Sequence, residues 1–288
     1  MNKIKKKIVL AAAFFIMFVS CSSAPKNSGD VYHYRTQAEM LLDSGNRESS
    51  KGNFNNSLVI LSESKRLSIL SDDPSLLIRS SLARGNVLLS LGRINEAFLE
   101  WEQAAAVAEK LGNRELVSAC RIFHSRGSLL TGRLSAQSVL NTVNSEQENI
   151  RQNRLYIAFS WQTKGLALRA LNSPAEAEDA ILRSLEIHQK DMYLENASFD
   201  WYTIASIRSL SGNTTGALRA LEASIEIDRR IENSYGLAAS WRAMGDVYRK
   251  SGREQEALEA YGRAKSIYSA LGYEREVREI DARMGLKE

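Results

Sequence analysis

The chain has 288 residues, of which 38 are basic and 34 acidic, and only three prolines interrupt it. Four of the basic residues are the lysines at positions 3, 5, 6 and 7, so the rest of the chain carries as many basic as acidic residues, 34 of each. This balance gives no support for nucleic-acid binding, which needs a concentrated basic face, and two cysteines are too few for a disulfide framework.

The N-terminal lysines are followed by twelve apolar residues, Ile8 to Val19. This arrangement is typical of a secretory signal peptide and is too short to span a bilayer, so we predict a signal peptide over residues 1–20. The next residues, Phe18-Val19-Ser20-Cys21, resemble the bacterial lipobox in the relaxed form of spirochaetal lipoproteins. The resemblance implies that cleavage leaves a diacylated Cys21 at the N-terminus. Alternatively, Cys21 is an ordinary residue beside a signal-peptidase site.

Residues 21–30 are mostly small and polar, the composition of a flexible tether. Fully extended, such a segment reaches about 30 Å. We therefore expect the folded part to stay close to the membrane that holds the lipid. That membrane is the cell membrane or the outer membrane, and the protein faces the periplasm or the cell surface.

Between residues 31 and 272 the sequence repeats with a period of 40 residues. The first column of the repeat contains Leu41, Ser81, Trp161, Trp201 and Trp241. Four residues later the column contains Gly45, Gly85, Gly165, Ala205 and Gly245. A third column, suited to ending a helix in the left-handed conformation, contains Gly52, Gly92, Asn172, Gly212 and Gly252. Small and then bulky residues follow in a second helix, at Ser57, Ala97, Ala177, Ala217 and Ala257 and at Leu61, Trp101, Ile181, Leu221 and Tyr261.

Each unit is therefore predicted to be a helix, a tight turn and a second helix, with the small residues allowing the two helices to cross closely. Six such hairpins occupy residues 31–272. The third fits only if its register slips by one residue, which places Cys120, His124 and Ala136 in the columns. Residues 273–288 supply a charged capping helix, from Glu274 to about Met284, and a tail.

The last unit carries the pattern of a known family. Bulky, small and aromatic residues stand in the expected order at Trp241, Met244, Gly245, Tyr248, Ala257, Tyr261 and Ala264, and this order resembles the tetratricopeptide repeat family. The resemblance implies an all-α, right-handed α-solenoid that binds proteins on a concave surface lined by the first helix of each hairpin. The tryptophan column is then interpreted as core packing; the alternative is a ligand box.

The resemblance also implies candidate partner-binding residues on the concave surface. These are Asn46, Asn86, Arg121, Gln162, Arg169, Tyr202, Arg242, Asp246 and Arg249. Some family members clamp a C-terminal carboxylate with lysine and asparagine, but Leu42 and Leu82 stand where that clamp has lysine. Arg242 and Arg249 either form a carboxylate site or lie on a solvated face, where Asp246 pairs with one of them.

Known catalytic and phosphate-binding motifs are absent from the sequence, so we predict no catalytic residues, cofactor or metal. The one unusual pair is Cys120 with His124, at i and i+4. This pair is interpreted either as half of a metal site or a reactive thiol, or as ordinary core packing. We predict a membrane-anchored scaffold or adaptor that binds other envelope proteins or peptides. The alternative is an auxiliary ligand-binding component of a periplasmic solute transport system, which requires a lined cavity.

Overall fold

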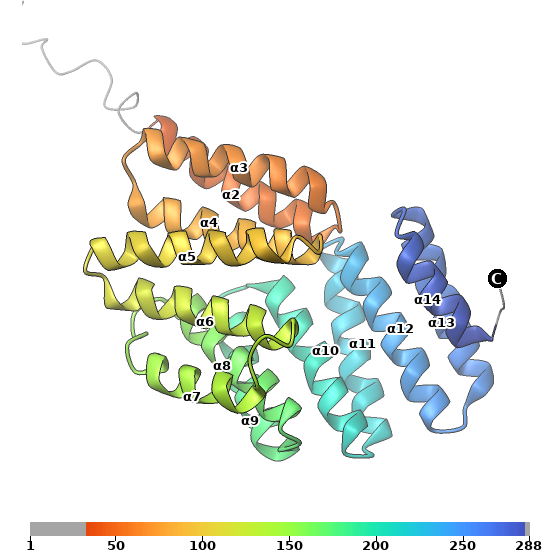
Figure 1. Cartoon of the computed structure of the whole chain (residues 1–288). Coiled ribbons are helices and arrows are strands. Elements are labelled where there is room, and N and C mark those ends of the chain that lie inside the picture. Colours follow the sequence, from red (N-terminus) through yellow and green to blue (C-terminus); the bar gives the residue numbers. More distant parts are fainter. Residues whose placement is uncertain (1–32, 286–288) are drawn as a thin grey trace, which may run out of the picture.

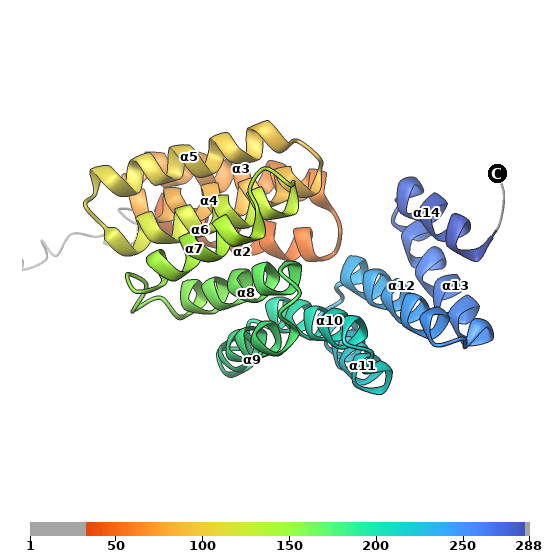
Figure 2. The same ribbon diagram turned by 60° about the horizontal axis from the view of Figure 1, so that its bottom comes forward.

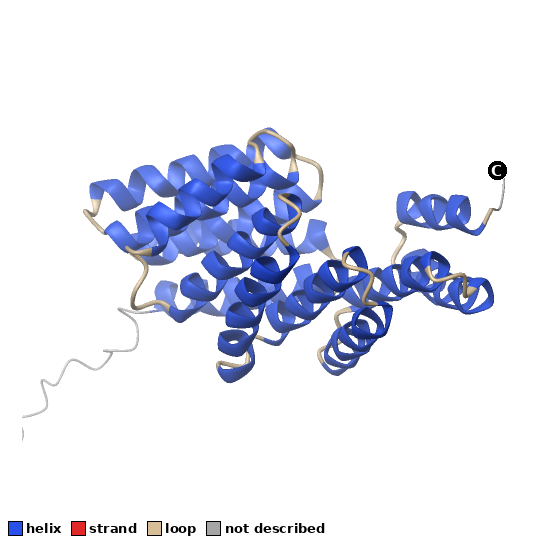
Figure 3. Ribbon diagram, turned by 90° about the horizontal axis from the view of Figure 1, so that it is seen from below, coloured by secondary structure: helices blue, strands red, loops and turns tan. Residues whose placement is uncertain are grey.

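The structure, a computed structural model, describes residues 33–285, so the expected signal peptide, Cys21 and the tether lie outside the described residues. The described part is all-helical and contains no strand (Figures 1 and 3). None of its helices is long and apolar enough to cross a membrane. The helices are α2 (His33–Ser50), α3 (Phe54–Leu70), α4 (Pro74–Ser90), α5 (Ile94–Lys110), α6 (Arg114–Leu130), α7 (Ala136–Gln147), α8 (Arg154–Ala170), α9 (Pro174–Lys190), α10 (Leu194–Leu210), α11 (Thr214–Arg230), α12 (Ser234–Lys250), α13 (Glu254–Ala270) and α14 (Glu274–Met284).

The helices pack as six consecutive hairpins, from α2 with α3 to α12 with α13, and α14 closes the array. This confirms the predicted all-α solenoid of six hairpins with a capping helix. Successive first helices (α2, α4, α6, α8, α10, α12) also contact one another directly, whereas successive second helices make fewer direct contacts. Because a curved array is concave on the side where neighbours crowd together, the first helices form its inner face.

The chain turns by the same device after almost every helix. A residue with positive φ ends the helix and lets the chain reverse within three residues. For example, Gly92 has φ of 73°, and the next amide, that of Arg93, donates to the Leu88 carbonyl at 2.9 Å. These residues recur every 20 positions, at Gly52, Asp72, Gly92, Gly112, Gly132, Asn172, Met192, Gly212, Glu232, Gly252 and Gly272.

Position 152 breaks this rhythm, and it lies in the segment that follows the third hairpin, between α7 and α8. The first helix of that hairpin, α6, begins at Arg114, which is 40 residues after Pro74 and 40 before Arg154. The expected one-residue slip is therefore wrong for α6, where Ser125, not His124, takes the place of Gly165. The second helix is displaced by two residues instead, because the turn before it is longer, and its buried side chains are Val139, Val143 and Glu146.

The third hairpin also has a short second helix, since α7 contains 12 residues where α5 and α9 contain 17. An irregular segment, residues 148–153, follows it. The Glu115 carboxylate of α6 accepts three successive backbone N–H groups of this segment, from Arg151, Gln152 and Asn153, at 3.2, 2.9 and 2.8 Å. These N–H groups lie just before α8, where a negative charge is favourable. Glu115 therefore accepts the hydrogen bonds that backbone carbonyls would accept if α7 were as long as the other second helices.

The array curves so far that its first hairpin contacts its last ones. The turn between α2 and α3 lies beside the start of α12 in two views (Figures 1 and 2). The Tyr273 hydroxyl donates to the Gly52 carbonyl, and the Ser50 hydroxyl donates to Glu195 of α10 at 2.8 Å. Gly52 is buried with φ of 86°, and a Cβ there would lie 3.2 Å from the Tyr235 Cβ. A larger residue would therefore be strained and crowded at this point.

An aromatic cluster completes this closing contact, which we define as Ser50, Gly52 and Phe54 against Glu195, Tyr235 and Tyr273. The Phe54 ring lies edge-on to Tyr235 and Tyr273, with centroids 5.3 and 6.2 Å away. Edge-to-face pairs at such distances are stabilising. The described chain thus forms one turn of a superhelix held by contacts between its two ends.

Asp228 is a buried carboxyl near the closing contact, and its titration gives the fold a pH dependence. Its side chain is 1% exposed, and Asn233 Nδ2 donates to Oδ1 at 2.7 Å. Burial, with the nearby Glu195 charge adding to it, raises the pKa of Asp228 from 3.8 to about 6. Folding therefore favours the protonated carboxyl. The resulting stabilisation is fully present below about pH 4 and is lost as the pH rises to 6.

We expect Asp228→Asn to raise the free energy of unfolding at pH 7.5 by on the order of 2 kcal/mol, because the amide carries no buried charge. At pH 4 the variant and the wild type should be nearly equal. Urea denaturation at both pH values measures this difference. The exposed Asp43→Asn change serves as the control, and a variant that is destabilised equally at both pH values would contradict the assignment.

Candidate functional site: the inner face

The inner face of hairpins three to five is built around a ladder of aromatic and arginine side chains. Phe123 of α6 stacks on Phe159 of α8, with ring centroids 3.9 Å apart and planes inclined by 13°. The Arg126 guanidinium lies over Phe159 at 4.6 Å and over Phe199 of α10 at 5.0 Å. Phe199 in turn stacks against Tyr202, with centroids 6.2 Å apart. Stacking of this kind fixes three successive first helices against one another.

A buried polar network lies directly beneath this ladder. Arg126 donates to the side-chain oxygen Oε1 of Gln162, and Gln162 Nε2 donates to Asp200 Oδ1 at 2.7 Å. The other carboxylate oxygen, Oδ2, lies 2.6 Å from His188 Nδ1. Burial lowers the pKa of Arg126 to about 10, against the opposing effect of the Asp200 charge, so Arg126 stays charged at neutral pH. This chain of buried hydrogen bonds links α6, α8, α9 and α10, and so favours one arrangement of these helices.

At the C-terminal end of the ladder, α14 covers part of α12. Arg242 is 23% exposed, lies beside Tyr202 and pairs with Glu279 of α14 at 3.5 Å. Arg249 pairs with Glu254 at 3.0 Å and donates to the Arg283 carbonyl. These two arginines therefore contact different carboxylates and do not converge on one empty site.

Asp246 also contacts the C-terminal helices. It accepts from the Tyr261 hydroxyl at 2.7 Å and pairs with Arg283 at 3.1 Å. No ion pair between Asp246 and either Arg242 or Arg249 is found in residues 33–285, so the pairing that the sequence suggested within α12 is replaced by pairing with α13 and α14.

The structure brings together only some of the residues predicted for the inner face. Tyr202 and Arg242 are neighbours, and Arg169 donates to the Ser206 hydroxyl at 3.0 Å, which links α8 to α10. Gln162 lies in the buried network with 1% of its surface exposed. Asn46 and Asn86 are exposed on α2 and α4, and neither side chain has a hydrogen-bond partner in the described part of the chain.

Arg121 has a different position from the one predicted, because α6 keeps the 40-residue register and does not slip by one residue. It is the counterpart of Trp161, whereas the counterpart of Gln162 and Tyr202 is the buried Ile122. The Arg121 guanidinium pairs with Glu146 at 2.9 Å and with Glu109 at 3.5 Å. Arg121 therefore lies between α5 and α7, away from the aromatic ladder.

Cys120 and His124 are ordinary packing residues in the structure. Cys120 is 1% exposed, and burial raises the pKa of its thiol to about 12, which keeps it protonated and unreactive. The His124 ring packs edge-on against Phe98, with centroids 4.7 Å apart. Within residues 33–285 no group of three or more histidine, cysteine, aspartate or glutamate side chains could hold a metal ion.

Sequence reasoning missed three members of the ladder, Arg126, Phe159 and Phe199. Phe159 and Phe199 are 40 residues apart, so the repeat itself could have identified them as a column. Arg126 occupies the place of Asn46 and Asn86 in the columns, but the expected one-residue slip concealed that equivalence.

Comparison with known proteins gives a family match for one part of the chain and similar folds for most of it. Residues 199–270 match the sequence model of the tetratricopeptide repeat, and no curated protein sequence matches the chain. Similar solved structures include BtubC from P. vanneervenii, with 16% identity, a TM-score of 0.54 and coverage of 78% of this chain and 92% of that one.

Two further similar structures contain bound molecules. A Rap protein complexed with competence and sporulation factor has 14% identity and a TM-score of 0.59, with 86% of this chain and 74% of that one covered. Bacillus thuringiensis PlcR in complex with the peptide PapR7 and DNA has 13% identity and a TM-score of 0.61, with 77% and 83% covered. Residues 199–270 are thus tetratricopeptide repeats by sequence, and the chain carries the tetratricopeptide repeat fold.

Proposed function

We propose that the protein is a non-enzymatic, lipid-anchored scaffold of the bacterial cell envelope that binds segments of partner proteins on its inner face. The observation that carries the proposal is the end of the ladder, where Tyr202 and Arg242 lie side by side and partly exposed on rigidly packed helices. Tyrosine and arginine contribute much of the binding energy at protein interfaces. Because neighbouring helices already hold both side chains in place, binding a partner there costs little side-chain entropy.

The fold and its relatives support a binding role. Arrays of this kind present extended concave surfaces, and the similar structure of PlcR was solved with a peptide bound. The inner face has both stacking surfaces and donors, at Phe199, Arg169 and Ser206. An extended peptide or a helix fits such a surface.

Replacing Tyr202 and Arg242 together by alanine should weaken binding of the main partner at least tenfold, a loss of about 1.4 kcal/mol. Helical content should not change, since neither side chain belongs to the fully buried core. Titration of the purified partner against both proteins measures the effect. The control is Arg183→Ala with Glu186→Ala on the outer helix α9, and this variant should bind the partner normally. Normal binding by the inner-face variant together with weak binding by the α9 variant would show that the site lies on the outer helices.

The anchor is proposed from the sequence around Cys21. A diacylated cysteine supplies the two chains that stable membrane attachment needs. Cys21→Ser should therefore move the protein from the detergent phase to the aqueous phase of a Triton X-114 partition. Equal partitioning of the wild type and the variant would show that no lipid is attached there.

The closing contact favours a second candidate, the auxiliary ligand-binding component of a solute transport system. That function needs a lined cavity, and an array closed into one turn is the geometry from which such a cavity is made. Native mass spectrometry of the purified protein distinguishes the two functions. A stoichiometric small molecule would support the transport function, and a protein partner alone would support the scaffold.

A further inference from the structure

A groove between the last two hairpins exposes a tryptophan ring, and two arginine side chains lie over this ring. Trp241 of α12 forms its floor together with Met244 and Ala260, and the second helices α11 and α13 form its walls. Its volume is about 530 Å³. The inner-face residue Arg242 is one position further along α12, which is about 100° around the helix, so this groove, the Trp241 groove, is a separate surface.

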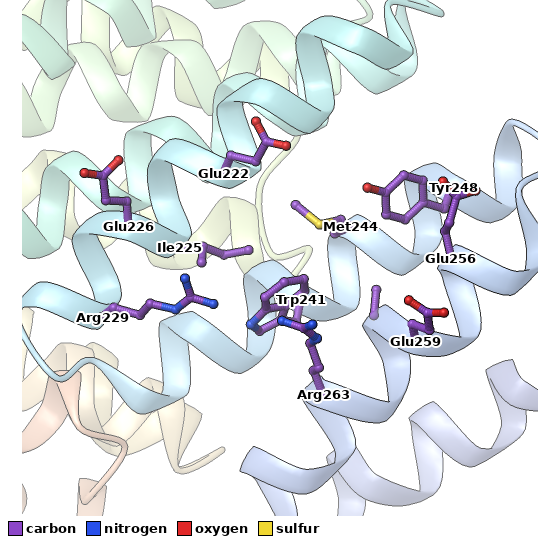
Figure 4. Close-up of a pocket in the computed structure, with 11 residues that line it drawn as sticks. Glu222, Ile225, Glu226, Arg229, Trp241, Met244, Tyr248, Glu256, Glu259 and Arg263 are labelled. Atoms are coloured by element: carbon purple, nitrogen blue, oxygen red, sulfur yellow. The ribbon is translucent and has the colours of Figure 1, made fainter.

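Charged side chains of both signs line the Trp241 groove, as Figure 4 shows. Arg263 of α13 lies over the indole at 4.5 Å, and Arg229 of α11 lies over it at 5.8 Å. The other charged residues of the lining are the acidic Glu222, Glu226, Glu256 and Glu259. Glu226 lies on the same side as Arg229, whereas Glu222 and Glu256 lie nearer to Met244 and Tyr248 (Figure 4).

These charged groups are largely without partners in the protein itself. In the part of the chain that the structure describes, neither Arg229 nor Arg263 has a carboxylate within 4.0 Å, and Glu222 and Glu259 pair with no basic group. Of the acidic residues in the wall, Glu256 alone is paired, with Arg253. The groove therefore offers two free cations beside a half-buried aromatic ring, and free anions beside its apolar floor.

The equivalent groove of the third hairpin shows the opposite condition. It has a volume of about 430 Å³ and contains Arg121 in the place of Trp241. There Glu109 and Glu146 pair with Arg121 at 3.5 and 2.9 Å, while Arg114 of the same groove has no carboxylate within 4.0 Å in the described residues. At the central position of each groove, therefore, Arg121 is neutralised by the protein itself, whereas the arginines over Trp241 keep their donors free for a ligand of complementary charge.

We propose that the Trp241 groove binds a short peptide segment in which an acidic residue and a basic residue flank apolar side chains. The carboxylate bridges Arg229 and Arg263, whose donors remain free while their flat faces lie on the indole. The apolar side chains cover Trp241 and Met244. The basic side chain lies among Glu222, Glu256 and Glu259. This surface is independent of the inner face, so the protein can hold two segments at once.

The test uses four synthetic peptides, acetylated and amidated, with one to four leucine or alanine residues between a glutamate and a lysine. Their binding is followed by tryptophan fluorescence and calorimetry at low ionic strength. At least one peptide should bind. The same peptide with glutamine in place of both the glutamate and the lysine should bind at least tenfold more weakly. Arg229→Ala with Arg263→Ala should reduce binding at least tenfold while leaving the circular dichroism unchanged.

The matched control is Arg183→Ala, since Arg183 lies over Trp161 at 4.8 Å in the same kind of contact but in another groove. It should leave peptide binding unchanged. Equal binding of the charged and neutral peptides, no binding by any of the four, or phosphate binding as tightly as the peptide would each overturn the proposal. Because Tyr202→Ala with Arg242→Ala should leave this binding intact, failure here is distinct from failure of the inner-face proposal.

Discussion

Replacing Trp101 by alanine is expected to lower the free energy of unfolding by about 3–5 kcal/mol, the usual cost of removing a large buried aromatic side chain. Trp101 is 1% exposed, and its indole Nε1 donates to the Leu82 carbonyl at 3.3 Å. It also fills the space between α4 and α6, because a Cβ on either Gly85 or Gly127 would collide with the indole. The two glycines and the tryptophan thus join the second hairpin to the third.

Urea denaturation followed by circular dichroism measures this loss. The matched control is Trp161→Ala, because Trp161 is half-exposed and lies on the surface between second helices. That change should cost about 1 kcal/mol. Equal losses from the two changes would mean that Trp101 does not hold these hairpins together.

Breaking the closing contact should lower the stability of the first hairpin, including when the substituted residue lies at the other end of the array. Phe54→Ala removes a ring that is 7% exposed and should cost about 3 kcal/mol. Tyr273→Ala removes the hydroxyl that donates to Gly52 together with a second ring of the same cluster. Both variants should speed hydrogen exchange in α2 and α3, because the contact links the two ends of the array.

Tyr273 provides the sharper test, since it lies 221 positions from Gly52 and belongs to no helix of the first hairpin. Small-angle scattering should show a larger radius of gyration for Tyr273→Ala. Met40→Ala, at a position that is 65% exposed on α2, should change neither measurement. Unaltered exchange in α2 and α3 of the Tyr273 variant would show that the ends move independently.

Much of the fold could be predicted from the sequence because its constraints are local. A left-handed residue at a turn and a small residue at a helix crossing each depend on neighbours within one hairpin, so columns such as Gly165 and Gly245 repeat visibly. A Cβ at Gly245 would lie 2.5 Å from the Tyr261 ring, which explains that column. The third hairpin is the exception, because its longer turn moves only the second helix. In α6 the polar Arg121 and Ser125 occupy the in-register columns, so the apolar stripe through Cys120 suggests a slip of one residue that the helix does not have.

The closing contact, and the pairing of Arg126 with the phenylalanine column of the inner ladder, could not be predicted in the same way. Curvature adds up over six hairpins, so the meeting of Phe54 with Tyr235 depends on small rotations that no single unit encodes. The ladder depends on pairs such as Arg126 with Phe199, which are 73 positions apart and not in one column. The Trp241 groove was concealed for a related reason: the tryptophan column was interpreted as core, whereas Trp161, Trp201 and Trp241 are each only half-buried.

Site-specific photocrosslinking in living cells tests the central claim, that partners bind on the inner face, most directly. A photoreactive amino acid would be placed at Tyr202 on the inner face and, in a second strain, at Leu182, which is 41% exposed on the outer helix α9. The account predicts one dominant crosslinked protein from position 202, its loss when Arg242 is also replaced by alanine, and no such product from position 182. A dominant product from position 182 with none from position 202 would contradict the account.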